Sequence, residues 1–545
     1  MFNKISRLYH TIKYLRVQQV FWRGINLLPR LVNQKRTHPV VIQECPNNYY
    51  IFRKGITQDY KTFTFLCESY NIKQVGWDNS SISKLWRYNL HYFEFLIQEK
   101  ASSEQIFSQY NIIENWLENN SYGKGTGWEP YPTSLRIINW IKWHWNTSQL
   151  SEKAKLSLWN QVRWLAFRPE YHLLGNHLFI NAKALLYASV FFSLDSSSNI
   201  YKIGNSILKK ELDEQFLLDG AHFELSPMYH SLAMEDLLDL ISISEKLPSS
   251  FSKQKIIEKY KKGMAWLETF VYNNNELAHF NDCANRIAPT YTELESYAAK
   301  LGVKKNEPCS SKFLYHEKSG FIVFKDEKSH LIADVGIIGP DFLPGHAHAD
   351  TLSFELAIKG QRVIVNSGTS VYGVSRERLR QRGTAAHSTV QIDDNDSSEV
   401  WSGFRVARRA KPFNVELNSK FELNSIIRFS ASHDGYKKLI NAPIHRRTWH
   451  FNDIEWFVED DISGNENYVV SRYHLHPEIQ IRKFGNRYIF SKKGVSLAEC
   501  TFSAFVEVEI CNTTYHDEFG ISKPNKCIQT KSFSPCKFEI IIKIL

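Results

Sequence analysis

The hydrophobic period of this chain changes once, near residue 310. Between residues 80 and 305, apolar side chains recur every three to four positions, as they do along one face of an amphipathic helix. This spacing is clearest in 134–145, 153–167 and 234–246. Many helices in succession, joined by short connections, predict helical hairpins that stack as a bundle or an α/α toroid.

Beyond residue 310 the period becomes two. Residues 352–359 alternate apolar and polar side chains, which is typical of a β-strand. Further short runs of β-type residues follow at 363–365, 389–392 and 456–458. The pairs Lys359-Gly360 and Asp434-Gly435 fit hairpin turns. This half is therefore predicted to be an antiparallel β-sandwich.

These patterns divide the chain into three parts. A length of 545 residues exceeds what one hydrophobic core normally supports. Residues 66–308 are predicted to form the helical domain and residues 309–545 the sheet domain. Residues 1–65 are ambiguous, and we expect them to pack as an N-terminal extension. The predicted fold class is multidomain α + β.

The charge of the chain favours an acidic partner. The formal net charge is +10, and a basic surface attracts anionic ligands. The densest basic clusters lie at 376–382 and 405–409, and neither is a run of the nucleic-acid-binding type. No nucleic-acid partner is expected. An anion-binding groove and a solvated basic face both remain open.

The N-terminal segment 1–30 mixes Lys and Arg with short apolar stretches. It contains no continuous apolar core of the secretory type, and no run of 18 apolar residues marks a transmembrane span. We therefore expect a cytoplasmic protein. Association with the inner membrane is the other expectation, with this basic segment acting as an amphipathic surface helix.

The stretch from Gly345 to Asp350 concentrates chemistry in the sheet half. His346 and His348 are two residues apart, so strand alternation would point both imidazoles to one side. Convergent imidazoles suit either a metal site or a proton-transfer site. Asn366 and His387 follow as further candidates.

Two stretches of the helical half could bind and transform an anionic ligand. Asn176 and His177 open a predicted helix, where an amide, an imidazole and backbone N–H groups can hold a carboxylate. A helix cap by Asn176 explains the same pattern equally well. Tyr229 could serve as an acid or base near a charged group. Taken alone, the residue is better explained as a packed core tyrosine.

Other side chains are candidates for contact with a sugar. Trp128 and Glu129 precede Arg136 in a segment that could line a sugar groove, although a loop packed on a helix explains it equally well. Glu224 lies close to Tyr229 in the sequence, and Arg382 ends the basic cluster. These five complete the set of predicted substrate-binding residues: Trp128, Glu129, Arg136, Glu224 and Arg382.

Taken together, the stretches resemble the heparinase II/III-like polysaccharide lyases, a family that includes heparan sulfate, heparin and alginate lyases. The resemblance covers roughly residues 80 to 480 in collinear order. It rests on Gly175-Asn176-His177, Asn181-Ala182-Lys183, His222-Phe223-Glu224, Ser226-Pro227-Met228-Tyr229, Asn281-Asp282, Gly345-His346-Ala347-His348-Ala349-Asp350, Leu352-Ser353-Phe354, Arg382-Gly383-Thr384-Ala385-Ala386-His387-Ser388-Thr389, His445-Arg446-Arg447 and His474-Leu475-His476-Pro477.

The resemblance implies an incomplete (α/α) toroid followed by an antiparallel β-sandwich, with an active cleft between them. It also implies β-elimination at a uronic acid of an acidic polysaccharide. Asn176 and His177 would neutralise the sugar carboxylate so that negative charge can build up. Tyr229 would protonate the leaving oxygen and could also act as the base. His346 is the other candidate base.

The resemblance further implies one structural zinc ion in the β domain and no organic cofactor. The matching positions are His348, Asn366 and His387. Asn366 stands where the family has an Asp, and an amide oxygen is a weaker, uncharged zinc ligand. Either a zinc ion or a hydrogen-bond network in its place is therefore expected. Family habit places such enzymes in the cell envelope or periplasm.

Two other functions stay open. A glycoside hydrolase on the same toroid would need two carboxylates facing each other across a cleft, and Glu129, Glu224 and Asp350 are the candidates. A non-catalytic factor that binds acidic glycan during polysaccharide synthesis would keep the cleft without turnover. The sequence does not specify the polymer, its sulfation or the oligomeric state.

Overall fold

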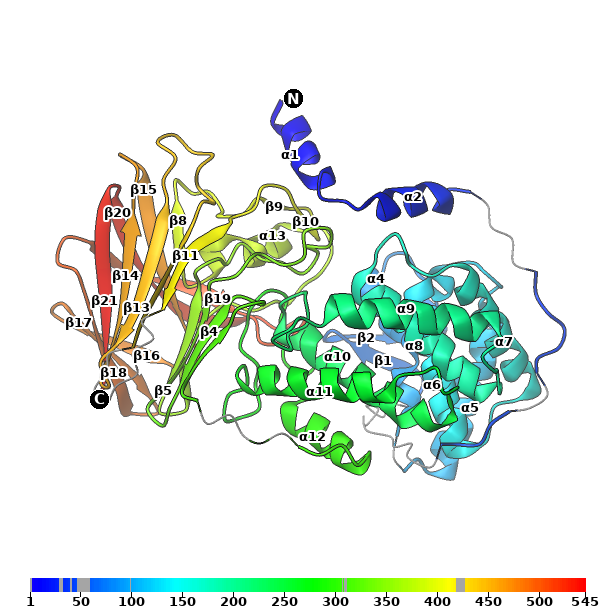
Figure 1. Cartoon of the computed structure of the whole chain (residues 1–545). Coiled ribbons are helices and arrows are strands. Elements are labelled where there is room, and N and C mark those ends of the chain that lie inside the picture. The colour runs from blue at the N-terminus through cyan, green and yellow to red at the C-terminus, as the bar shows by residue number, and fades with distance from the viewer. Residues whose placement is uncertain are drawn as a thin grey trace.

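In the computed structural model of this chain, a helical domain and a β domain lie side by side, and two N-terminal helices lie along the same edge of both (Figure 1). The structure describes residues 2–28, 33–39, 42–46, 59–98, 100–305, 307, 311–417 and 427–545. Within these ranges, no helix has both the length and the apolar character that crossing a bilayer requires.

The helical domain is an incomplete (α/α) toroid, as predicted. The N-terminal helices are α1 (Phe2–Ile12) and α2 (Val17–Asn26). The helices of the toroid are α3 (Ile72–Val75), α4 (Lys84–Tyr92), α5 (Ser103–Asn119), α6 (Pro130–Thr147), α7 (Glu152–Phe167), α8 (Gly175–Phe191), α9 (Asn199–Gln215), α10 (Pro227–Ile243), α11 (Lys253–Glu268) and α12 (Tyr291–Lys300). Two of the segments with the clearest helical period lie within α6 and α7, and the third, 234–246, covers α10 and the short 3-10 helix Ser244–Lys246 that follows it, so these predictions are confirmed.

Local sequence signals set the start of α10, which carries Tyr229. The Ser226 hydroxyl accepts the Tyr229 N–H at 3.3 Å, and Pro227 occupies the first helical position. A serine cap followed by proline is a strong helix start, because it satisfies an otherwise unpaired N–H and presets the backbone. Tyr229 is thereby fixed in the first turn of a rigid helix.

The β domain consists of two large antiparallel sheets. One has the order β11-β12-β13-β14-β21-β18-β17-β16 and the other β19-β20-β15-β7-β6-β5-β4-β3, with β8 pairing to β15. The bounds are β3 (Phe313–His316), β4 (Phe321–Lys325), β5 (Ser329–Asp334), β6 (Phe354–Ile358), β7 (Gln361–Val365), β8 (Val390–Ile392), β11 (Pro412–Leu417), β12 (Ile427–His433), β13 (His445–Phe451), β14 (Glu455–Ile462), β15 (Tyr468–Leu475), β16 (Gln480–Phe484), β17 (Arg487–Lys492), β18 (Val495–Phe502), β19 (Glu507–Tyr515), β20 (Lys523–Phe533) and β21 (Cys536–Ile544).

Smaller elements complete the two domains. The helix α13 (Arg376–Arg382) lies in the β domain, close to the two-stranded ribbon of β9 (Val400–Trp401) and β10 (Arg405–Val406). A second ribbon, β1 (Thr62–Phe65) with β2 (Glu68–Asn71), packs on the toroid. Phe63 of β1 is buried in the toroid core. The helical domain therefore begins before residue 66, where the predicted boundary cuts this hairpin.

One sheet is covered on both faces, and this arrangement joins the domains. In β4, Phe321 and Val323 belong to a core shared with toroid residues, whereas Ile322 and Phe324 belong to the core between the sheets. Trp266 of α11 extends the shared core toward Phe321, with ring centroids 6.1 Å apart. Strand alternation places successive side chains on opposite faces. Residues 321–324 of the strand are all apolar because both faces are buried there.

The two hairpin predictions had different outcomes. Lys359 and Gly360 both adopt positive φ and connect β6 to β7, as expected. Asp434 and Gly435 do not form a tight hairpin, because β12 ends at His433 and β13 begins only at His445. That prediction was wrong. The predicted domain junction at residues 306–308 lies largely outside the described residues.

A buried ion pair in the sandwich gives a stability test. Burial alone would raise the pKa of Asp460, but the Arg447 guanidinium outweighs it and holds the pKa well below its usual range. Both side chains are fully buried, and Nε of Arg447 lies 2.7 Å from the carboxylate. Asp460→Asn leaves a buried charge without compensation, which we expect to cost about 3–5 kcal/mol. Urea unfolding measures this loss.

The matched control is Glu416→Gln, which removes the exposed partner of the adjacent Arg446. We expect this change to cost less than about 1 kcal/mol, because solvent screens the pair. Equal losses in the two variants would contradict a structural role for the buried pair.

Candidate active site

A single buried carboxylate organises the space between the domains. Asp282 follows Asn281, whose positive φ turns the chain after the toroid helices. Its oxygens accept hydrogen bonds from Nδ1 of His346 at 2.9 Å and from Nε2 of His348 at 2.8 Å. The Arg378 guanidinium from α13 binds the same carboxylate with two nitrogens, one of them at 2.6 Å. One side chain thus connects the toroid with two loops of the β domain.

The charge of Asp282 determines the protonation of His346. Burial would raise the pKa of Asp282, but Arg378 and the two imidazoles hold it well below its usual range. An ionised carboxylate only accepts hydrogen bonds. Nδ1 of His346 must therefore carry a proton. In the neutral ring, Nε2 is then the lone-pair nitrogen and can accept one.

Tyr229 lies directly against His346. The two rings are tilted by 33° with centroids 3.9 Å apart, and the Tyr229 hydroxyl is 2.9 Å from that of Tyr372. Burial raises the pKa of Tyr229, and the nearby Asp282 carboxylate raises it further. The phenol is therefore held protonated beside a ring nitrogen that can accept a proton. A neutral acid next to a base is the arrangement that two coupled proton transfers need.

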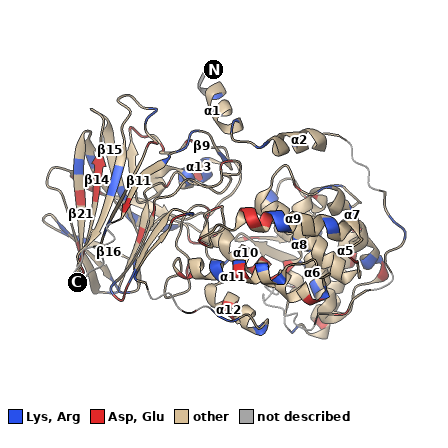
Figure 2. Cartoon of the chain, viewed as in Figure 1, with Lys and Arg blue, Asp and Glu red and all other residues tan. Residues whose placement is uncertain are grey.

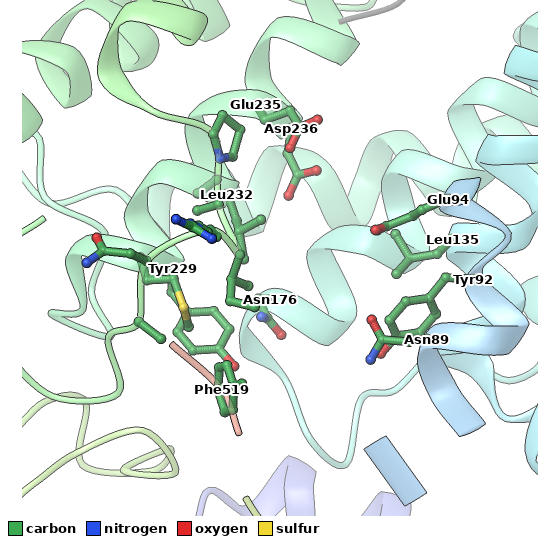
Figure 3. Close-up of a pocket in the computed structure, with 18 of the residues that line it drawn as sticks. Asn89, Tyr92, Glu94, Leu135, Asn176, Tyr229, Leu232, Glu235, Asp236 and Phe519 are labelled. Carbon is green, nitrogen blue, oxygen red and sulfur yellow. The ribbon is translucent and has the colours of Figure 1, made fainter. Parts of the chain in front are cut away.

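The start of α8 supplies the polar groups facing this pair. Figure 3 shows Asn176 close to Tyr229 at the edge of a cavity. Burial lowers the pKa of the adjacent His177, but the Glu170 carboxylate, 3.2 Å from Nδ1, outweighs it, and the net shift is upward. A cationic His177 next to backbone N–H groups at a helix N-terminus is suited to binding a carboxylate.

Glu224 connects the start of α8 to His346. It accepts a hydrogen bond from the backbone of Asn176, and its Oε2 lies 3.9 Å from Nε2 of His346. Burial raises the pKa of Glu224. The groups predicted from both halves of the sequence, Asn176, His177, Tyr229 and His346, are therefore brought together around this side chain.

The cavity has a volume of about 1060 Å³ and lies between the domains. Its walls come from α6, α8 and α10 of the toroid and, on the other side, from Tyr372 and residues 517–519 of the β domain. Asn176 and Tyr229 both line it. This volume is large enough for several sugar rings.

The described lining of the cavity is acidic rather than basic. Eight carboxylates line it: Glu94, Glu235, Asp236, Asp239, Glu276, Glu293, Asp517 and Glu518. The described Lys and Arg side chains that line it are Lys142, Lys183, Arg286 and Lys523. The net positive charge of the chain is therefore not concentrated on this part of the cavity wall.

Three of the predicted substrate-binding residues lie in the interior. Trp128 is 5% exposed and packs in the toroid core. Arg136 is fully buried, stacks on Trp116 at 4.1 Å and donates to Gln161 at 2.9 Å. Arg382 is also fully buried and donates to the Ala347 carbonyl at 3.0 and 2.8 Å. Direct contact of these three with substrate was a wrong prediction.

The remaining two predicted substrate-binding residues, Glu129 and Glu224, lie in different surroundings. Glu129 is bound by the Tyr88 hydroxyl and by Lys84 at 2.9 Å and is not among the described residues that line the cavity, so its contact with substrate stays a prediction. Glu224 lies beside His346, within the site.

Two of the three predicted zinc ligands, His348 and His387, lie within hydrogen-bonding distance of each other. Nδ1 of His348 lies 3.3 Å from Nε2 of His387, while Nε2 of His348 is bound to Asp282. Oδ1 of Asn366 already accepts the Ser388 N–H at 3.1 Å. Within the described ranges, no three His, Cys, Asp or Glu side chains are grouped to hold a metal ion. Zinc stays a prediction of the resemblance alone.

Sequence reasoning missed the roles of Asp282, Arg378 and Tyr372. Asp282 entered only as part of the resemblance. The basic cluster 376–382 was treated as one group, although Arg378 is buried on Asp282 and Arg380 is half-exposed. The arginine spacing on α13 was the available signal, because residues 378 and 382 share a helix face.

The comparisons with known proteins agree with this architecture. Residues 97–301 match the family description Heparinase II/III N-terminus, and residues 310–544 match Heparinase II/III-like, C-terminal. The chain belongs to the heparinase II/III-like family.

Two relatives show how close the sequence similarity is. The chain is 24% identical over 335 residues to a heparin-sulfate lyase of Bacteroides stercoris, covering 57% of this chain and 47% of that protein. A heparin-sulfate lyase of Pedobacter heparinus is 26% identical over 247 residues, covering 41% and 36%. The chain thus spans about half or less of the length of these relatives.

Solved structures share the fold over most of their length. A crystal structure of heparinase III aligns with a TM-score of 0.68 at 17% identity, covering 97% of this chain and 89% of that one. The heparan sulfate lyase of Pedobacter heparinus aligns with a TM-score of 0.58 at 18% identity, covering 89% and 81%. Both confirm the toroid-plus-sandwich architecture.

The carboxylate of Asp282 can be tested directly. Asp282→Asn keeps the shape but replaces an oxygen with an N–H donor and removes the charge that fixes the His346 proton on Nδ1. We expect turnover to fall by about 10²-fold or more, in line with the contribution of a positioned acid or base. The remaining activity should depend less on His346, because the ring loses the acceptor that orients it.

A control separates orientation from folding. Thermal unfolding of Asp282→Asn shows whether the loss of the Arg378 pair destabilises the domain interface. The matched control variant is Asp236→Asn, which removes a carboxylate of the cavity wall that is paired with Lys183 at 2.7 Å. Unchanged turnover in Asp282→Asn would contradict the role of Asp282 in orienting His346.

Proposed function

We propose that this protein is a polysaccharide lyase that cleaves a uronate-containing acidic glycan by β-elimination. The observation that carries the proposal is the contact of Tyr229 with His346, whose Nδ1 is bound by Asp282. An oriented base and a neutral phenol share one space, and a carboxylate-binding helix start lies beside them. Relatives described as heparin-sulfate lyases support the same reaction class.

The first requirement of the reaction is to weaken the C5–H bond of the uronate. A side-chain base cannot remove this proton unless the neighbouring carboxylate is neutralised. Asn176 and a cationic His177 would bind that carboxylate and stabilise the negative charge that develops on it. Since Glu170 raises the pKa of His177, the cation persists to a higher pH than a free histidine would.

The second requirement is proton transfer at C5 and at the leaving oxygen. Nε2 of His346 takes the C5 proton, and the C5–H electron pair forms a C4–C5 double bond. The C4–O bond breaks, and the Tyr229 hydroxyl protonates the leaving oxygen. Tyr229 is suited to the acid role because its raised pKa keeps the phenol protonated. When the substrate is the C5-epimeric uronate, His346 and Tyr229 can exchange the roles of base and acid.

The arrangement does not favour a glycoside hydrolase. That reaction needs two carboxylates on opposite sides of the bond to be cleaved. Of the three candidates, Glu129 is bound by the Tyr88 hydroxyl and by Lys84, and Glu224 is buried. Asp350 is buried, and its Oδ2 accepts a hydrogen bond from the Asn281 N–H at 3.3 Å. The non-catalytic alternative is less favoured because the proton-transfer groups are all present and oriented.

Elimination is tested by the new double bond, which absorbs ultraviolet light. We expect absorbance to rise when the protein is incubated with a suitable uronate polymer, and the rate to fall about 10²–10⁴-fold in Tyr229→Phe. Tyr88→Phe is the control, because its hydroxyl contacts Glu129 outside the described cavity lining.

Glu224→Gln separates the mechanisms. A hydrolase releases reducing ends without the ultraviolet signal, and it would lose activity in Glu224→Gln while Tyr229→Phe stayed active. Binding of acidic glycan without any product, unchanged in Tyr229→Phe, would select the non-catalytic factor.

The acidic lining supports a substrate with few negative charges beyond its uronate carboxylates. A cleft lined mainly by carboxylates repels a densely sulfated chain. We therefore propose a sparsely sulfated or unsulfated uronate polymer as substrate. Alginate, hyaluronan and N-acetylated, unsulfated heparan chains have this charge, whereas heparin does not.

The measurement is the rate of cleavage of polymers that differ only in their sulfation. We expect kcat/KM to fall at least about tenfold from an unsulfated polymer to its sulfated counterpart, with the difference shrinking at high salt because screening weakens repulsion. Glu94→Gln and Glu235→Gln should reduce the discrimination. Faster cleavage of the sulfated polymer would contradict this assignment without affecting the elimination chemistry.

A further inference from the structure

The N-terminal helices α1 and α2 point their apolar faces away from the protein. We propose that residues 2–28, called the N-terminal strap below, bind the surface of an anionic lipid bilayer. The strap would lie in the interface plane, with apolar side chains inserted and basic side chains at the level of the headgroups. The proposal rests on the orientation and charge of the strap and does not depend on the reaction.

The helix α1 is docked on the protein through its polar side. Ser6 accepts a hydrogen bond from Arg408 at 2.6 Å, Arg7 is paired with Glu399 at 2.8 Å, and Thr11 accepts one from Trp401 at 3.1 Å. The opposite side carries four apolar residues at helical spacing, which are 46–64% exposed: Ile5, Leu8, Tyr9 and Ile12. A helix on a soluble protein normally turns such a face inward.

The helix α2 repeats this orientation. Gln19 is buried and donates to the Phe342 carbonyl at 3.2 Å, and Trp22 stacks on Tyr171 with centroids 4.9 Å apart. The outward side and the turn that follows carry apolar residues that are 54–87% exposed: Val17, Val20, Phe21, Leu27 and Leu28. Two consecutive helices that both turn their apolar side outward form an extended apolar surface, and such a surface marks an interaction site.

Charge identifies the partner. The strap contains five Lys and Arg and no Asp or Glu, and two of the five, Arg7 and Arg16, are paired with Glu399 and Glu214. Figure 2 shows no acidic colour on α1 or α2. Lys4, Lys13 and Arg23 are exposed. A basic amphipathic element without acidic residues matches the uniform negative charge of anionic headgroups.

The same charge disfavours a second copy of the chain on this surface. Two straps brought face to face would place their Lys and Arg side chains against each other, without an acidic residue of the strap to compensate. Like charges in apposition oppose association. An anionic bilayer covers the apolar face and neutralises the basic residues at once.

The strap is linked to the candidate active site through one loop. Gln19 binds the Phe342 carbonyl, and the Arg16 guanidinium lies 3.5 Å from the Phe342 ring centroid. Four residues later in the chain, His346 reaches Asp282. Membrane binding would therefore hold the cleft next to the bilayer, where it could meet a glycan chain at the membrane surface.

The experiment is co-sedimentation of the full-length protein with vesicles. We expect binding to vesicles of phosphatidylcholine mixed with phosphatidylglycerol, and at least tenfold weaker partitioning to phosphatidylcholine alone. Replacing Leu8, Ile12 and Phe21 together by Ser should lower partitioning at least tenfold, since it removes inserted apolar area. Replacing Lys4, Lys13 and Arg23 by Gln should lower it about a hundredfold and weaken its salt dependence.

The control variant replaces Phe484, Val495 and Phe533, which are exposed apolar residues of the β domain, by Ser. It should bind vesicles like the unmodified protein. Thermal unfolding and light scattering accompany every variant. Equal partitioning to neutral and anionic vesicles, or full binding by the Leu8, Ile12 and Phe21 variant, would overturn the proposal. So would a dimer that this variant dissociates, because the face would then be covered by a second copy.

Discussion

The buried carboxylate of Asp282 is the interaction on which the site depends. It lies at the end of the toroid, yet its partners come from the β domain: His346, His348 and Arg378. A buried charge is stable only when it is paired and hydrogen-bonded. This requirement fixes two segments of the β domain against the toroid and, in doing so, holds His346 against Tyr229, which lines the cavity.

The apolar core between the domains makes that geometry rigid. Phe321 and Val323 of β4 pack against toroid residues, while their neighbours in the strand fill the sandwich core. Because packed interiors tolerate little displacement, the two halves of the site keep their spacing without a ligand. Rigid elements also carry the reacting groups: Tyr229 is in the first turn of α10 and Asn176 is in the first turn of α8.

Positive charge and the cavity are separated in this molecule. From composition alone, the net charge of +10 was compatible with an anion groove. The described cavity wall is instead rich in carboxylates, and most of the excess charge belongs to residues 1–43. Net charge is a property of the whole surface and does not locate a binding site. Among the exposed basic residues, Lys4, Lys13 and Arg23 belong to helices whose apolar faces point outward.

The sequence by itself determined the architecture, since hydrophobic period follows local geometry: 3.6 residues for a helix and two for a strand. It also brought Asn176, His177, Tyr229 and His346 forward as candidates through residue type and resemblance. Only the tertiary structure decided that Trp128 and Arg136 are core residues and that Asp282 is the centre of the site. Burial and convergence depend on contacts between residues far apart in the chain, and no local pattern contains them.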